Sequence, residues 1–234
     1  MRAMLRRERR RRNLLAFQSN PPPFPHNVLI EHGDLPAPGV RTPELRVVIT
    51  GDRFLAEGIL QSPAPLCYYS IYSDVEEAFS ALKVESYVGV IIDLNGWSIP
   101  TMALIDRVRI LRQQRPELQI AFLTSEKESG MLSFLQASCR AIVINKRQKL
   151  AKVRALMQST SSPYSVQESV FSHKQWKILL LMAQGYSLRA IAQQQNLPYH
   201  RITYRTGSIL ALLRLSCRQQ LVRLLQRISD KTRF

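Results

Sequence analysis

Short apolar runs alternate with longer amphipathic stretches through the middle of the chain. Five runs have the length and β-rich composition of buried strands: 45–50, 66–72, 87–94, 118–125 and 140–146. Helical stretches follow them at 53–62, 74–83, 103–116, 130–139 and 149–159. Strands that alternate with helices of this length build βαβ units. The pattern therefore predicts an α/β doubly wound domain with a five-stranded parallel sheet over residues 45–158.

After residue 170 the spacing becomes purely helical. Apolar residues recur at i, i+3, i+4 and i+7 from Trp176 to Ala183, after a capping box formed by Ser172 and Gln175. Gly185 is suited to end this helix, and Ser187 to cap a short second one. The sequence predicts an all-α domain of four helices over residues 171–234.

The third and fourth helices follow a second break, at Asn196 and Pro198. The third helix has Ile202, Thr206, Ile209 and Leu213 at i, i+4, i+7 and i+11, on the side opposite its outward residues. A second capping box, Ser216 with Gln219, is predicted to open the fourth helix, whose apolar stripe is Leu221, Leu224, Leu225 and Ile228. That stripe is longer than packing within one small domain needs, so it predicts a dimer contact.

A short helix, a tight turn and a longer helix predict a helix-turn-helix. The outward side chains of the longer helix offer hydrogen-bond donors, positive charge and one aromatic ring; they are His200, Arg201, Thr203, Tyr204, Arg205 and Ser208. Arg201, Arg205 and Ser208 are predicted to form one stripe opposite Ile202 and Ile209. Such a helix is suited to the major groove of DNA. Lys174 and Arg189 are further candidate DNA contacts.

Charge supports two unlike domains. The net charge is +16, and residues 171–234 carry eleven Lys or Arg against one acid, Asp230. A basic domain beside a nearly neutral one indicates a polyanionic partner. The alternatives are a solubilising surface and an all-helical bundle with a basic solvated face. Cys67, Cys139 and Cys217 are far apart and the four histidines do not cluster, so no metal site or disulfide framework is predicted.

Residues 1–44 are basic and Pro-rich and read as a disordered tail, and 159–170 as an interdomain linker. A transit peptide, a mis-set translation start, and an RNA- or membrane-associated arm are alternatives for the tail. No apolar run is long enough to span a membrane. We expect a cytoplasmic protein, nucleoid-associated when bound to DNA.

Residues 171–225 resemble, without a gap, the DNA-binding domain of LuxR/FixJ-type regulators. The matching stretches are AQGYS (183–187), IA (191–192), the helix start at 198–202, IL (209–210) and RQQL (218–221). The resemblance makes the third helix the recognition helix and the fourth a dimerisation surface. The family usually has Thr, Lys and His where Arg201, Thr203 and Arg205 stand, so the base sequence read is predicted to be unusual.

Residues 45–146 resemble the receiver domain of response regulators. The resemblance implies a phosphoacceptor at Asp93, with Thr124 and Lys146 beside it. It also requires an acidic pair for Mg²⁺, but Thr50 and Gly51 stand there and Asp52 comes one residue late. Asp93 is therefore predicted to be a vestige held by Lys146. The alternative is a phosphorylation-competent receiver, the one case in which Mg²⁺ is a cofactor.

Together these readings predict a transcription regulator rather than an enzyme. It binds double-stranded DNA, independently of phosphorylation, as a homodimer or as a heterodimer with a related LuxR-type regulator. RNA polymerase is a further candidate partner. Thr203 and Tyr204 are predicted to read bases and Arg205 to hold phosphate, with Arg201 assigned to either role.

Overall fold

A computed structural model describes residues 44–61, 67–97, 99–148, 153, 155 and 171–229. All of them belong to one compact unit. Three predicted segments lie outside the described residues: the tail except for Glu44, the linker at 159–170, and the helix at 149–159 except for two residues. Within the described part, no helix has the length and apolar composition needed to cross a membrane.

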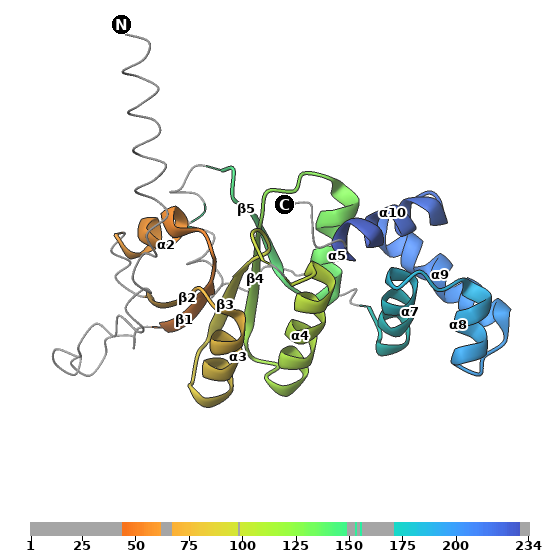
Figure 1. Cartoon of the computed structure of the whole chain (residues 1–234), viewed down its shortest axis with the longest axis horizontal. Coiled ribbons are helices and arrows are strands. Elements are labelled where there is room, and N and C mark those ends of the chain that lie inside the picture. The colour runs from red at the N-terminus through yellow and green to blue at the C-terminus, as the bar shows by residue number, and fades with distance from the viewer. Residues whose placement is uncertain are drawn as a thin grey trace, which may run out of the picture. The chain divides into compact units, whose positions relative to one another are not determined.

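The first half contains one parallel five-stranded sheet with the order β2-β1-β3-β4-β5 (Figure 1). The strands are Glu44–Ile49 (β1), Cys67–Tyr72 (β2), Gly89–Asp93 (β3), Gln119–Thr124 (β4) and Ile142–Asn145 (β5). All five predicted strands are confirmed. Because the strands are parallel, their carboxyl ends share one edge, where Asp93 is in register with Leu123 and Thr124 with Asn145.

Helices cover both faces of the sheet. They are Arg53–Leu60 (α2), Val75–Val84 (α3), Thr101–Gln114 (α4) and Ser129–Cys139 (α5). Alternate strand residues divide between two apolar clusters: Ile49 and Ile92 pack with α3, α4 and α5, whereas Val48 and Ile91 pack with Ile59 of α2. The predicted cap of α3 is confirmed, because the Asp74 carboxylate accepts a hydrogen bond from the Glu77 amide at 2.8 Å.

The second half consists of His173–Ala183 (α7), Leu188–Gln194 (α8), Tyr199–Leu213 (α9) and Arg218–Ser229 (α10). The predicted breaks have the expected backbone: Gly185 has φ +89° and Asn196 φ +50°. The capping box at Ser172 is confirmed, with both reciprocal hydrogen bonds to Gln175 present. Pro198 stands at the N-cap of α9.

The second predicted capping box is wrong by one residue. Gln220, not Gln219, turns back, and its Oε1 accepts hydrogen bonds from the Ser216 amide at 3.0 Å and the Ser216 hydroxyl at 3.2 Å. The reason is the start of α10 at Arg218, which makes Gln220 the third helical residue. That position is the one from which a glutamine reaches back over the helix start.

Candidate nucleic-acid interface and receiver site

Helix α9 divides into a buried side and an outward side. Its buried residues are Ile202, Thr206, Ile209 and Leu213, the four inward positions that the sequence predicts. The spacing of four, three and four residues keeps them within one narrow sector of a helix that turns 100° per residue. This sector packs α9 onto the other helices and fixes which side chains point away.

The centre of the outward side is Tyr204, whose side chain is 78% exposed. His200 and Gly207 are exposed beside it. The predicted stripe of Arg201, Arg205 and Ser208 opposite the core is therefore wrong. At 100° per residue these three side chains lie along one flank of α9 rather than opposite Ile202. Arg201 is exposed, but Arg205 and Ser208 are only partly exposed.

Two hydroxyls of the predicted interface already donate within α9. The Thr203 hydroxyl donates to the Tyr199 carbonyl at 3.1 Å, and the Ser208 hydroxyl donates to the Tyr204 carbonyl at 3.3 Å. A hydroxyl has one proton, so each can still accept a hydrogen bond but is not free to donate one. Thr203 can therefore meet a base with its methyl group or as an acceptor, which narrows its predicted role.

Arg205 is placed between the flank and the body of the domain. Its Nη1 atom is buried and has no hydrogen-bond partner among the described residues. A covered guanidinium nitrogen without a partner is unfavourable, because water no longer solvates it. The arrangement leaves the other guanidinium nitrogens to meet an external acceptor, which suits a phosphate oxygen.

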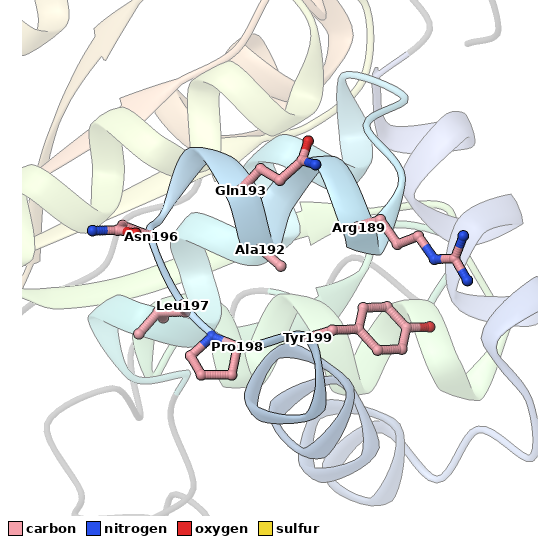
Figure 2. A pocket seen from close by; sticks show the side chains of 7 residues that line it. All are labelled: Arg189, Ala192, Gln193, Asn196, Leu197, Pro198 and Tyr199. Carbon is pink, nitrogen blue, oxygen red and sulfur yellow. The ribbon is translucent and has the colours of Figure 1, made fainter.

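A shallow hollow lies at the turn between α8 and α9 (Figure 2). Its lining consists of Arg189, Ala192, Gln193, Asn196, Leu197, Pro198 and Tyr199. The side chains of Arg189 and Tyr199 extend to the same side of this turn, as Figure 2 shows. The sequence predicted Arg189 but missed Tyr199, which is 47% exposed. An aromatic residue in the first turn of the longer helix of a predicted helix-turn-helix is the signal that could have found Tyr199.

Lys174 and His200, the remaining predicted contacts, are both exposed. Lys174 stands in the first turn of α7, outside the lining of this hollow. The four helices carry no acid, since none occurs between Glu168 and Asp230. An acid-free surface with exposed arginines and exposed tyrosines is suited to a phosphate backbone and to base edges.

The receiver-like half has its own candidate site, at Asp93 where β3 ends. Asp93 is fully buried. Its Oδ2 accepts hydrogen bonds from Lys146 Nζ at 2.7 Å and from the Thr50 hydroxyl at 2.9 Å, and its Oδ1 accepts one from the Asn95 amide at 3.0 Å. The structure thus brings Asp93 and Lys146 together as predicted, and adds the Thr50 hydroxyl and the Asn95 amide as two further donors to the carboxylate.

The side chains of Asp52 and Thr124, near Asp93, make other interactions. Asp52 caps α2 through the Phe54 and Leu55 amides, and its other oxygen lies 3.6 Å from Lys146 Nζ. Thr124 is buried, and its hydroxyl accepts a hydrogen bond from the Glu126 amide at 3.1 Å. The sequence missed the role of Thr50, because the resemblance marked it only as a missing acid.

These residues do not fit Mg²⁺. The described part of the chain contains no cluster of three or more His, Cys, Asp or Glu side chains able to hold a metal ion. Mg²⁺ requires several hard oxygen ligands. At this site one carboxylate is bound by Lys146, Thr50 and the backbone, the other caps a helix, and the position of a third acid is taken by a hydroxyl that donates to Asp93.

Comparisons with known proteins give the following likenesses. No protein-family model matches the sequence. The Fimbriae Y protein of Salmonella typhimurium strain LT2 is 36% identical over 140 residues, which are 60% of this chain and 58% of that protein. The chain thus spans less than two thirds of the length of this curated relative.

Among solved structures, RcsB of Salmonella enterica serovar Typhimurium bound to promoter rprA with the phosphomimetic BeF3- is 19% identical, with a TM-score of 0.44 over 79% of this chain and 98% of that one. Full-length FixJ from B. japonicum is 15% identical, with a TM-score of 0.43 over 80% and 98%.

The strand order, the helices on both faces of the sheet and the four C-terminal helices confirm the fold predicted from the sequence. The chain thus has a doubly wound α/β half with a parallel five-stranded sheet, followed by an all-α half of four helices with a helix-turn-helix at α8 and α9.

Proposed function

We propose that this protein is a sequence-specific DNA-binding transcription regulator that inserts α9 into the major groove. The observation that carries the proposal is the exposure of Tyr204 at the centre of the outward side of α9, on helices that lack any acid. A large exposed aromatic side chain with a polar tip has an unfavourable apolar surface in water. Base edges in a groove would cover that surface and pair with its hydroxyl.

Arg201, Arg189 and the free nitrogens of Arg205 would hold phosphates around this contact. Phosphate contacts fix the register of a protein on DNA, and base contacts select the sequence. Tyr199 extends to the same side of the turn as Arg189, and its hydroxyl would donate a hydrogen bond to the DNA backbone. The proposal contains no enzymatic step. Binding to RNA polymerase stays a prediction from the resemblance alone.

The test begins with mapping of the occupied chromosomal sites, followed by binding of the purified chain to one of them. Tyr204→Ala should weaken binding to that site by about 1–3 kcal/mol and change binding to random DNA little. Tyr68→Ala removes an exposed tyrosine of β2 and is the matched control. Unchanged affinity of the Tyr204→Ala variant for the mapped site would sink the proposal.

We also infer that regulation does not require phosphorylation of Asp93. Support comes from the burial of Asp93 and from the three hydrogen bonds that occupy its oxygens. A phosphodonor must reach one of those oxygens, and the product needs a metal to neutralise its charge. Phosphorylation-competent signalling is a second candidate, favoured by the 2.7 Å contact of Lys146 with Asp93.

A small phosphodonor with Mg²⁺ separates the two candidates. The parent chain should show no Asp93-dependent labelling. Asp93→Asn should leave DNA affinity unchanged while lowering the free energy of unfolding, because the amide no longer balances Lys146. Lys146→Met is the paired control for the stability loss. Stoichiometric labelling of Asp93 together with a tenfold change in DNA affinity would favour the second candidate.

A dimer, with itself or with a related LuxR-type regulator, stays part of the proposal. The sequence assigned this contact to the apolar stripe of α10. That stripe is at most 3% exposed within the single chain, so it does not by itself call for a second copy. A dimer on DNA would then form through another surface. Sedimentation with and without the mapped site measures whether one or two chains bind.

A further inference from the structure

Helices α7 and α10 pack against α4 and α5 of the receiver-like half in the same chain. Trp176 of α7 is 4% exposed and packs on Phe134 of α5, with ring centroids 6.0 Å apart. Phe171, just before α7, lies 5.5 Å from Phe134 and 6.2 Å from Trp176. Three aromatic rings from the two halves thus form one cluster, and the apolar core continues from the sheet into the C-terminal helices.

A buried arginine donates hydrogen bonds to backbone groups of both halves beside this cluster. The Arg109 guanidinium of α4 lies 4.4 Å above the Trp176 ring and donates to the carbonyls of Ser138 and, at 3.0 Å, Phe171. The Trp176 indole donates to Asp106 Oδ1 at 2.6 Å. A guanidinium removed from water is tolerated only when its donors are satisfied. Here the satisfying groups come from both halves.

An ion-pair network closes the edge of the contact. Arg227 of α10 pairs with Glu126 at 2.9 Å and also with Glu128. Glu126 and Glu128 raise the pKa of Arg227 although its partial burial would lower it. A single exposed ion pair contributes little to stability, but two carboxylates on one guanidinium form a network that holds the Arg227 side chain in one orientation.

Close approach at α5 depends on a glycine. A Cβ atom at Gly130 would stand 3.0 Å from Leu215 Cδ2 and 3.6 Å from Leu224 Cδ1. The first distance is tighter than ordinary van der Waals contact, so a Cβ atom would require the end of the Leu215 side chain to shift by a few tenths of an ångström, and a side chain as large as leucine would need more room than this contact leaves. At the far end, Ile228 reaches a small hollow that Leu94 and Thr124 also line, beside the strand edge that holds Asp93.

The contact between the two halves buries the apolar stripe of α10, and the outward side of α9 stays exposed to solvent. Leu221, Leu224, Leu225 and Ile228 are all buried, whereas Tyr204 is 78% exposed. A surface that combines a continuous apolar core, a satisfied buried arginine and a glycine-dependent fit has the composition of a stable interface rather than of a transient one.

We infer that the α4–α5 face is a permanent docking surface for the chain's own α7 and α10, so that both halves act as one rigid body. On this inference the receiver-like half is a scaffold that presents α9, and α10 is an intrachain helix instead of a dimer contact. The role of α9 in this statement rests on the proposed function, whereas the docking itself does not.

Hydrogen exchange of the full-length chain, measured without DNA, tests the docking. The combined variant Gly130→Leu with Arg227→Glu should raise amide exchange at least tenfold in α10 and in α5 together, and leave β1 and β3 unchanged. Gln136→Leu on α5 and Arg223→Glu on α10 place similar changes at exposed positions and should alter nothing. Arg227→Glu combined with Glu126→Arg and Glu128→Arg reverses the network and should restore protection.

Two outcomes overturn the inference. One is exchange in α10 of the parent chain that is already fast and unaffected by Gly130→Leu. The other is a parent dimer in sedimentation that the large-to-small change Leu225→Ala dissociates while α5 keeps its protection. DNA is absent from both measurements, so a failed docking surface and a failed DNA-binding proposal are distinguishable.

Discussion

At the scale of single residues, the side chains of α9 differ in which of their hydrogen-bonding groups remain free. Tyr204 is exposed, the hydroxyls of Thr203 and Ser208 already donate to carbonyls one turn back, and Arg205 has one buried nitrogen without a partner. The residue types were readable from the sequence. Their availability depends on the angle at which each leaves α9 and on what lies beside it.

Arg205→Ala is expected to weaken binding to specific and random DNA by a similar factor. The reason is that a phosphate contact is independent of base sequence and releases about one counterion. The log–log slope of affinity against salt should become shallower by about one. Binding titrations at several salt concentrations measure both effects.

Arg214→Ala, at the exposed end of α9, is the comparison for loss of one charge. It should leave the salt slope unchanged if the phosphate contact is local to Arg205. Loss of binding to the mapped site alone in the Arg205→Ala variant would instead assign Arg205 to base reading.

At the scale of elements, two positive-φ residues decide how α8 and α9 are aimed. Gly185 and Asn196 end the helices before and within the helix-turn-helix, and both were predicted from residue type. A positive φ at these positions can be predicted from the sequence, because few residue types other than Gly and Asn adopt it without strain. The exact N-cap is less predictable, as the shift from Gln219 to Gln220 at α10 shows. Helix starts depend on packing that fixes the first turn.

Asn196→Val should lower the free energy of unfolding by about 1–2 kcal/mol, because a β-branched residue is strained at φ +50°. DNA affinity should fall with it, since the turn sets the direction of α9. Asn196→Gly keeps the conformation accessible and is expected to stay near the parent value. Urea unfolding and binding to the mapped site supply the two measurements. Equal stability of the Val and Gly variants would contradict the assigned backbone.

At the scale of the whole molecule, the two halves share one apolar core. The sequence pattern divided the chain into two domains, whereas buried residues of both halves belong to one apolar cluster. Such contacts join residues about 70 to 100 positions apart, such as Trp176 with Asp106 and Arg227 with Glu126. Periodicity within a window cannot detect partners at that separation.

The thiols provide a measure of this packing. Cys139 and Cys67 are buried, and burial raises the pKa of both, that of Cys139 to about 11. Cys217 is exposed in the turn before α10. At pH 8 the raised pKa values leave little thiolate at the buried positions, so an aromatic disulfide reagent should titrate one thiol in the native chain and three after unfolding.

A Cys217→Ser variant should then show no fast-reacting thiol. Rapid reaction of all three cysteines in the native chain would mean that the packing around α5 and β2 opens readily. The same assay on the Gly130→Leu variant reports whether loosening of the docking surface exposes Cys139, which ends α5.

The sequence by itself determined the elements, their order and the candidate residues. Strand and helix periods, caps and left-handed turn residues are local properties, and the acid-free composition of 171–229 is a property of the chain. Two things were decided only by the tertiary structure: the recruitment of Thr50 to hold Asp93, and the burial of the α10 stripe inside one chain. Each depends on contacts between residues distant in sequence, and an apolar stripe alone does not specify what covers it.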